Sequence, residues 1–430
     1  MDTFMGDRSP SSCDMRVSSS GTLLSIMRRS SLLIVVTAFS VTVGRGQVLL
    51  GGDAKVGSHT DVQRNGSAIQ VEGHGPGTGG AYLPGEVLQD VLDDAVDGRA
   101  VFGISFAIDH GGRAWQGAAG DLIDNRPYFI ASTTKLFTTA IILGLRAEGR
   151  LELDDPISRF LDTATMRGLH VHRGVDRSDI ITIRHLLSHT SGLPDHFQDK
   201  GLGGKSLEEE LVSGRDRYWG FEQAMERTKE MGALFPPGAR GKAHYSDSNF
   251  QLLGRIIERI TEESFAQVCL ERIIRPLGLE DTYVYTDPRD TVPRTLYYSR
   301  APLSIPLYMS AAQADGGVVS TSHDLMVFLR AFMSGVLFPK AYISELQQWE
   351  RIFFPLRAGI GIHLLRIPWI MDPTRSVPVF IGHSGLSGAL AFYSPEDDLY
   401  IVGTVNQVAR PDLSFRMMIK LALSVRHEGR

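Results

Sequence analysis

The chain has 430 residues, of which 43% are hydrophobic and 22% are charged, and its formal net charge is −5. This composition is typical of a globular protein with enough apolar side chains for a large core. Because there is no basic excess, we expect no nucleic-acid partner. The two cysteines, Cys13 and Cys269, and the histidines have no zinc-binding spacing, so neither a metal nor a cofactor is expected.

Residues 1–47 are predicted to be an N-terminal extension that contains a signal peptide or an anchor. Arg28 and Arg29 precede a short apolar run at residues 32–43, and small residues follow it. This order is typical of a secretory signal. The run is shorter than the ~20 residues of a membrane-spanning helix, so an uncleaved anchor is the alternative. We therefore expect an exported protein, periplasmic or secreted, with membrane attachment only through this segment.

Residues 48–83 contain many glycines and polar residues without a periodic apolar pattern, which predicts a flexible linker. The folded domain is therefore expected at residues 84–430. It begins with an amphipathic helix at residues 86–96. Residues 101–120 then predict a strand, a tight turn and a second strand.

The C-terminal end is also expected to form strands. Residues 389–407 predict a hairpin that turns at residues 395–398, and residues 413–425 predict a terminal helix. Between about residues 151 and 338 the patterns are mainly helical and are separated by long loops. We therefore predict an α+β fold, with one antiparallel β-sheet built from both chain ends, flanked by helices, and an inserted, mostly helical lobe.

A serine and a lysine three residues apart, Ser132 and Lys135, stand at the start of a nearly all-apolar helix pattern. Ser132 would lie at the first turn of a buried helix, where free N–H groups favour negative charge. Lys135 would lie one turn further on the same face, where a cation can stabilise an alkoxide and transfer a proton. Taken alone, so short a pattern is more often a helix-capping serine with a lysine that reaches solvent.

Two further motifs follow in chain order. Tyr245 precedes a helix pattern within the stretch HYSDSN, and His383, Ser384 and Gly385 end a strand pattern before the C-terminal hairpin. With the S-x-x-K motif before them, this order resembles the superfamily of serine β-lactamases and penicillin-binding proteins. It is most similar to the class C β-lactamase-like branch, which also contains D-peptidases and carboxylesterases.

The segments at residues 181–195 and 312–332 also resemble signatures of this branch, and the resemblance extends over about residues 84–423. It implies a β-lactamase/transpeptidase-like fold. It also implies a serine hydrolase that cleaves ester or amide bonds through an acyl-enzyme.

The resemblance implies a role for each matching residue. Ser132 would attack the substrate carbonyl and become acylated, and Lys135 with Tyr245 would form the proton-transfer unit. A tyrosine has an ordinary pKa of about 10, so it acts as a base only if a neighbouring cation stabilises its phenolate, and Lys135 is the available cation. The backbone N–H groups of Ser132 and Leu386 would hold the oxyanion.

Asp247, His383, Ser384 and Gly385 match positions that bind substrate, and two of them depart from the usual pattern. Members that act on β-lactams or D-alanyl peptides usually have lysine at His383 and asparagine at Asp247. A neutral histidine attracts a carboxylate weakly, and a carboxylate cannot donate to a substrate carbonyl. Asp247 could instead pair with Lys135. Gly385 would let the strand come close to the substrate.

These differences favour an esterase or a D-peptidase that acts on a small ester, amide or peptide substrate. The alternatives are a β-lactamase and a non-catalytic member of the fold that binds cell-wall peptides. His185 and His189 are interpreted as histidines that hold a turn together by hydrogen bonds, in preference to metal ligands. The sequence does not indicate the oligomeric state.

Overall fold

The computed structural model describes residues 83–123 and 126–427. The leader predicted at residues 1–47 and almost all of the linker predicted at residues 48–83 lie outside these ranges. In the described part of the chain, no helix combines the length and the apolar character needed to cross a membrane.

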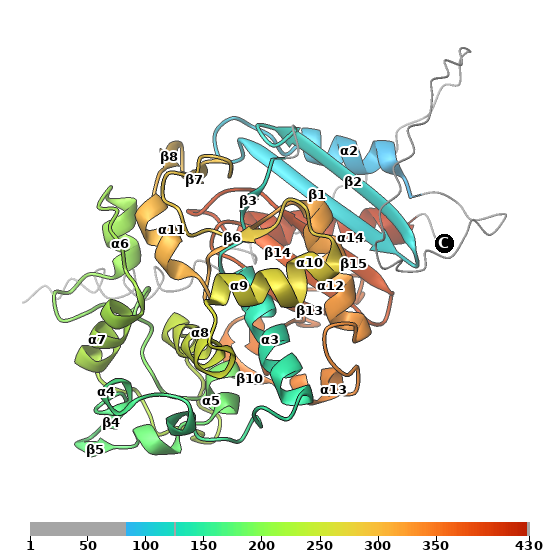
Figure 1. Cartoon of the computed structure of the whole chain (residues 1–430). Coiled ribbons are helices and arrows are strands. Elements are labelled where there is room, and N and C mark those ends of the chain that lie inside the picture. The colour runs from blue at the N-terminus through green and yellow to red at the C-terminus, as the bar shows by residue number, and fades with distance from the viewer. Residues whose placement is uncertain (1–82, 124–125, 428–430) are drawn as a thin grey trace, which may run out of the picture.

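An eight-stranded antiparallel sheet lies at the centre of the domain (Figure 1). The two chain ends pair directly within it, because β1 and β15 align from Ser105 opposite Thr404 to His110 opposite Leu399. The order across the sheet is β10 (Glu350–Phe353), β11 (Leu356–Ala358), β12 (His363–Leu365), β13 (Phe380–Ser384), β14 (Ala389–Ser394), β15 (Leu399–Thr404), β1 (Gly103–His110) and β2 (Arg113–Gly120).

This sheet confirms the α+β fold predicted from the sequence. The hairpins β1–β2 and β14–β15 are both present and are joined through the β1–β15 pair. The sequence did not predict β10, β11 and β12, which extend the sheet from residues 350 to 365. Strands of three or four residues are too short for an alternating pattern to be recognised.

Helices cover both faces of the sheet (Figure 1). Along β1, Phe106 and Ile108 belong to one hydrophobic cluster, while Ala107 between them belongs to another. This division follows from the alternation of side chains in a strand. The helices on the Phe106 face are α2 (Gly85–Asp93) and α14 (Asp412–His427), and those on the opposite face include α3 (Lys135–Ala147) and α12 (Ser322–Ser334).

The other elements form the inserted lobe and its connections, and most of them are short. The helices are α4 (Thr163–Met166), α5 (Ile183–Leu187), α6 (Leu207–Val212), α7 (Phe221–Met231), α8 (Asp247–Thr261), α9 (Phe265–Cys269), a π-helical segment (Leu270–Ile274), α10 (Arg275–Leu277), α11 (Pro306–Ala312) and α13 (Tyr342–Leu346). The strands are β3 (Tyr128–Phe129), β6 (Tyr283–Val284) and β9 (Val318–Ser320) in one small sheet, β4 (Val171–His172) with β5 (Val175–Asp176), and β7 (Leu296–Tyr298) with β8 (Ala301–Leu303).

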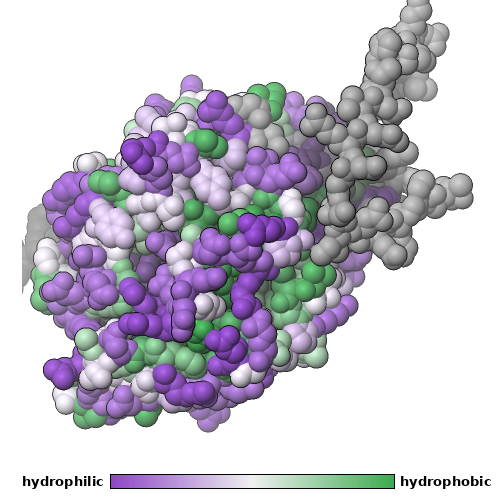
Figure 2. Space-filling view, viewed as in Figure 1, coloured by the Kyte–Doolittle hydropathy of each residue, from purple (hydrophilic) through white to green (hydrophobic). Residues whose placement is uncertain are grey.

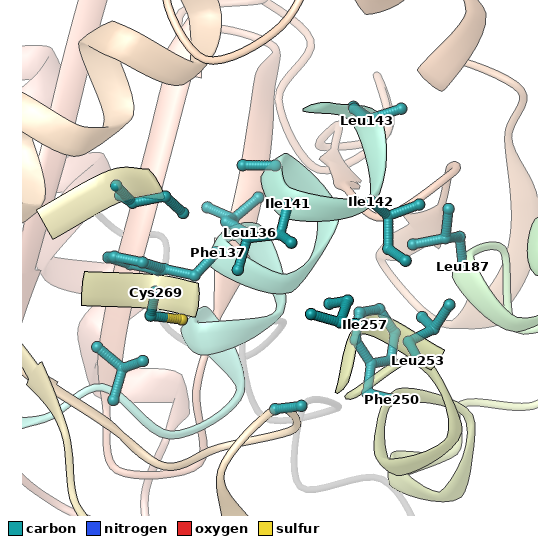
Figure 3. Packing of buried hydrophobic residues seen from close by; sticks show 14 of the residues in the cluster. Leu136, Phe137, Ile141, Ile142, Leu143, Leu187, Phe250, Leu253, Ile257 and Cys269 are labelled. Carbon is teal, nitrogen blue, oxygen red and sulfur yellow. The ribbon is translucent and has the colours of Figure 1, made fainter. Parts of the chain in front are cut away.

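Helix α3 runs through the core between the sheet and the lobe. Figure 3 shows Phe137 on the side of Cys269, and Ile142 on the side of Leu187 and Leu253. The ring of Phe137 also stacks on Phe328 of α12, with centroids 3.7 Å apart. Since α3 is held from both sides, the residues at its N-terminus have a fixed position.

The molecular surface differs from this core. Hydrophilic residues cover much of the face in Figure 2, with smaller groups of hydrophobic residues between them.

Candidate active site

The candidate nucleophile lies on a short turn between β3 and α3. Residues Ala131–Thr134 form a 3-10 turn, and α3 begins at Lys135. Ser132 therefore precedes the α-helix, whereas the sequence analysis placed it in the first helical turn. Ala131 has a φ of 44°, which is uncommon for a residue with a Cβ. The Val318 N–H donates a hydrogen bond of 3.1 Å to Thr134 Oγ1 and fixes the turn.

Lys135 is fully buried, with 0% exposure. Its Nζ donates to Ser132 Oγ at 3.0 Å and to the carbonyl oxygen of Asp315 at 2.6 Å. Asp247 Oδ1 lies 2.7 Å from the same nitrogen. All three oxygens thus lie within 3.0 Å of the buried Nζ. The alternative of a lysine that reaches solvent is therefore wrong.

The ion pair keeps Lys135 charged despite its burial. Burial alone would lower the pKa of Lys135, but interactions with Asp247, Tyr245 and Asp315 outweigh it, and the net pKa is raised. The pairing of Asp247 with Lys135 that the sequence analysis considered is present. Lys135 is consequently a protonated group that donates to Ser132 in the resting protein.

Tyr245 immediately precedes Ser246, the N-cap residue of α8. Its ring stacks on His189, with centroids 4.6 Å apart. Lys135 Nζ lies 5.3 Å from the centroid of the Tyr245 ring. The helix start and the histidine therefore hold the tyrosine beside the lysine, which brings Tyr245 into the same cluster as Ser132 and Lys135.

Tyr245 is un-ionised in the resting protein. Burial raises its pKa, and the charge of Asp247 raises it further. Lys135, and hydrogen bonds with Lys135 and Ser132, lower the pKa of Tyr245 but do not compensate. The role of Lys135 and Tyr245 as the proton-transfer unit stays a prediction.

Two buried carboxyl groups beside the ion pair were not singled out as site residues by the sequence analysis. The Asp247 N–H donates to Asp195 Oδ1 at 3.1 Å, and Gln251 Nε2 donates to Asp315 Oδ2 at 2.9 Å. Burial, and then the charge of Asp247, raises the pKa of Asp195 and of Asp315 well above the usual range. Both residues lie in segments that resemble signatures of the family. This was the only feature of the sequence that could have identified them as site residues.

Strand β13 ends beside the nucleophile turn. A Cβ on Gly385 would lie 2.3 Å from the carbonyl oxygen of Ile130 and 3.1 Å from the backbone nitrogen of Ser132. Glycine is therefore required by close contact with the nucleophile turn, whereas the sequence analysis considered only its approach to substrate. Leu386, the next residue, lines the same pocket as Ser132. The two expected oxyanion donors thus come from adjacent segments.

His383 is buried, with 1% exposure, and its ring stacks on His363 with centroids 3.9 Å apart. Burial lowers the pKa of His383 well below its usual value, and His363 and Lys135 lower it further. Its Nδ1 lies 3.0 Å from the Ser384 nitrogen and 2.9 Å from the Ser384 carbonyl oxygen. His383 is thus neutral. Neither it nor Ser384 lines the pocket beside Ser132, and their substrate-binding roles stay predictions.

A concave pocket opens beside Ser132. It lies between the nucleophile turn, the segment after β13, and parts of the lobe around α6 and α11. Concave sites with mostly apolar walls and a few polar groups typically bind small organic molecules. Its apolar lining residues include Phe129, Phe197, Leu211, Leu296, Leu303, Ile305, Tyr308, Met309, Leu386 and Val408, and its polar lining residues are Ser132, Glu208, Asp247, Asp315 and Ser387.

His185 and His189 have the structural roles predicted from the sequence. The Thr182 N–H donates to His185 Nδ1 at 3.2 Å, which completes a capping box at the start of α5. The Ser246 N–H donates to His189 Nδ1 at 3.1 Å and connects the loop after α5 to α8. The prediction that these histidines hold turns together is confirmed.

Comparison with known proteins identifies relatives over most of the described chain. A family model described as Beta-lactamase matches residues 88–422. D-alanyl-D-alanine-carboxypeptidase/endopeptidase AmpH of Escherichia coli (strain K12) is 27% identical over 274 residues, which is 61% of this chain and 66% of that protein. The chain thus spans just under two thirds of the length of this relative.

Solved structures have the same fold. The D-stereospecific amidohydrolase from Streptomyces sp. superposes with a TM-score of 0.64 at 28% identity, over 78% of this chain and 97% of that one. The D-amino acid amidase from Ochrobactrum anthropi SV3 superposes with a TM-score of 0.63 at 25% identity, over 80% of this chain and 100% of that one. With the family match, these similarities place the chain in the Beta-lactamase family, within the superfamily of serine β-lactamases and penicillin-binding proteins.

Proposed function

We propose that the chain is a serine hydrolase that cleaves ester or amide bonds through an acyl-enzyme on Ser132. Esterase or D-peptidase activity on small substrates is favoured over β-lactamase activity. The observation that carries the proposal is the position of Ser132. Its Oγ contacts the charged Lys135 Nζ at 3.0 Å, and the same residue forms part of the wall of a largely apolar pocket.

The proton path proposed here follows from the charges in the site. Tyr245 is un-ionised and lies beside Lys135 and Ser132. As Ser132 Oγ attacks the carbonyl carbon, its proton passes to the Tyr245 oxygen, and the Tyr245 proton passes to the leaving group. Lys135 stays protonated and stabilises the negative charge that develops on Ser132. No free phenolate is required before the reaction begins.

The backbone N–H groups of Ser132 and Leu386 would receive the oxyanion. Gly385 supports this arrangement, because its missing side chain lets the segment after β13 lie against the Ser132 nitrogen. Loss of one such donor typically costs about 10²–10³ in rate. Water would then attack the acyl-enzyme, with Tyr245 again transferring the proton.

The pocket and the neutral His383 support the substrate class. A largely apolar wall suits an acyl group with an aliphatic or aromatic side chain. A β-lactam bears a carboxylate, and neutral His383 offers it little attraction. The sequence similarity to a D-alanyl-D-alanine-carboxypeptidase/endopeptidase and to D-specific amidohydrolases supports the amide or peptide alternative. Export, predicted from residues 1–47, would bring the protein to substrates outside the cytoplasm.

The test is hydrolysis of p-nitrophenyl butyrate by the wild-type chain and by Ser132→Ala, with mass spectrometry of the quenched reaction. We expect turnover by the wild type, a butyryl adduct on the peptide that contains Ser132, and neither signal in Ser132→Ala. Ser344→Ala is the matched control, because Ser344 is an exposed serine on α13. Equal rates in all three proteins would contradict the assignment of the nucleophile.

Two further assays separate the alternatives. A fluorescent penicillin that acylates Ser132 and is released rapidly would support the β-lactamase, whereas slow release would support the peptidase. A non-catalytic member of the fold should resist both the ester and a serine-directed fluorophosphonate probe. Failure of all three reagents to modify Ser132 would favour that alternative.

A further inference from the structure

One carboxylate of the pocket stands outside the network around Lys135. Glu208 belongs to α6, and its neighbours Leu207 and Leu211 are buried in a hydrophobic cluster with Phe197 and Tyr308. A capping box between Ser206 and Glu209 fixes the start of the helix. Glu208 is therefore held in the pocket wall by the packing of its own helix.

The ion pairs of α6 leave Glu208 without a cation. Glu209 Oε1 lies 3.4 Å from Lys200 Nζ, and Glu210 Oε2 lies 2.8 Å from an Arg217 nitrogen. Within the described residues, Glu208 pairs with no lysine, arginine or histidine, and its carboxylate accepts only a hydrogen bond of 3.2 Å from Gln198 Nε2. The acid that faces the pocket is thus the unpaired one of three consecutive glutamates.

Glu208 is half-buried, and this partial burial changes the pKa of its carboxyl group. It raises the pKa of Glu208, and the charge of Asp247 raises it further. A carboxylate in a largely apolar wall is destabilised unless a positive charge or several hydrogen bonds compensate. An ammonium group on a bound molecule would supply that charge, whereas a second carboxylate would be repelled.

The pocket contains a second polar group without a partner. Ser387 is 2% exposed and lines the pocket beside Leu386. Within the described residues, its Oγ has no hydrogen-bond partner. Buried hydroxyl groups are normally hydrogen-bonded, so this atom also points to a bound molecule with polar groups of its own.

We propose that the pocket selects substrates whose acyl part combines an apolar side chain with an ammonium group, and that Glu208 is the residue that binds the ammonium. This inference rests on the proposed acyl-enzyme function of Ser132. An acyl group carrying both features is that of an amino acid with a free amine. The aromatic and aliphatic residues would bind its side chain, and Glu208 would form a charge-assisted hydrogen bond with its amine.

The test compares the p-nitrophenyl esters of D-phenylalanine and of 3-phenylpropionic acid, which differ only in the amino group. The assay is run at about pH 6, where an α-amino group is protonated. For the wild-type chain we expect kcat/KM to be roughly 10-fold to 100-fold higher for the D-phenylalanine ester. Glu208→Gln should lose this preference and retain the rate on the neutral ester. The matched control is Glu226→Gln, which removes the same charge from an exposed glutamate on α7 and should behave as wild type.

A second measurement uses the wild-type chain alone. Inhibition of neutral-ester hydrolysis by 2-phenylethylamine should require at least about tenfold less inhibitor than inhibition by 2-phenylethanol. This comparison does not depend on the folding of a variant. Comparable inhibition by the amine and the alcohol would overturn the inference.

The outcomes distinguish the inference from the function on which it rests. If the neutral ester acylates Ser132 but the ammonium ester is not preferred, only the inference is overturned. The same holds if Glu208→Gln keeps the preference. If neither ester acylates Ser132, the proposed function fails and the inference fails with it.

Discussion

The two sides of the site differ in how far their charges are already compensated. On the lysine side, Lys135 Nζ has partners in Ser132, Asp247 and Asp315 at 3.0 Å or less. On the pocket side, the Glu208 carboxylate has no cation and Ser387 Oγ has no hydrogen-bond partner within the described residues. The positive charge of Lys135 is therefore compensated without a ligand, whereas the Glu208 carboxylate has no counter-charge among the described residues.

This difference indicates that the catalytic groups and the groups that select the substrate lie on different sides of the site. The lysine side is supported by α3 and α8, which belong to the largest hydrophobic cluster, so its geometry is fixed before substrate arrives. The pocket side is built from short elements, α6, β7, β8 and α11, around a smaller cluster. We therefore expect substitutions on the lysine side to change rate and stability, and those on the pocket side to change substrate preference.

The largest effect should follow from removing the cation on the lysine side. Lys135→Met keeps the side-chain size but leaves Asp247 without its partner in a buried site. We expect a loss of unfolding free energy of about 3–5 kcal/mol and a fall in kcat/KM of about 10³-fold or more. Urea denaturation and ester hydrolysis measure the two effects.

The control is the double variant Lys135→Met/Asp247→Asn, which removes both charges. We expect it to regain part of the stability, because no unpaired carboxylate remains, and to stay inactive. Equal stability of Lys135→Met and the wild type would show that the ion pair is not the main support of the lysine side.

The next largest effect should come from changing the contact between the nucleophile turn and the segment after β13. Gly385→Ala would place a Cβ 2.3 Å from the Ile130 carbonyl oxygen, so the nucleophile turn and the Leu386 segment must move apart. We expect kcat to fall about 10²-fold through the displaced oxyanion donor, with a smaller change in KM. Gly203→Ala is the matched control, because nothing lies within 4 Å of a Cβ there. If both variants kept wild-type kcat, the close approach would have no catalytic role.

The sequence predicted the sheet and the main helices because their apolar patterns are long. β1, β2, β14 and β15 have six or eight residues each, and α8 and α14 extend over 15 and 16 residues. Such lengths make the period of the pattern visible. The three-residue and four-residue strands β10, β11 and β12 give no such signal, and they are defined only by the successive pairs β10–β11, β11–β12 and β12–β13.

The site was predictable to the extent that it lies in local motifs. Ser132 with Lys135, and Tyr245 with Asp247, are each close in sequence, and the structure brings the four together. Glu208 and His363 were not foreseen, because α6 and β12 reach the site only through tertiary packing. The protonation state of Tyr245 was not foreseen either. It depends on burial and on the charge of Asp247, which spacing does not reveal.

Replacement of Asp247 should have an intermediate effect, which concerns the pH dependence of kcat/KM. Burial and the charge of Asp247 raise the pKa of Tyr245, so Asp247→Asn should lower that pKa while Lys135 keeps its positive charge. The phenolate then forms at lower pH, and any alkaline rise in kcat/KM should begin at lower pH than in wild type. A pH–rate profile and an ultraviolet titration of tyrosine measure this. Asp179→Asn, which removes an exposed charge, is the control, and a shift of the rise to higher pH would contradict the prediction.

The smallest expected effect concerns the support of the pocket wall. Asp216 accepts hydrogen bonds from the N–H groups of Leu307 at 2.8 Å and Tyr308 at 3.0 Å, and so connects the loop after α6 to the start of α11. Asp216→Ala should cost about 1 kcal/mol of unfolding free energy and raise the KM of apolar esters a few-fold, with kcat unchanged because Lys135 is untouched. The exposed Asp179→Ala should change neither quantity. A fall in kcat with constant KM would mean that the pocket side also positions the reacting groups, and the separation between the two sides would not hold.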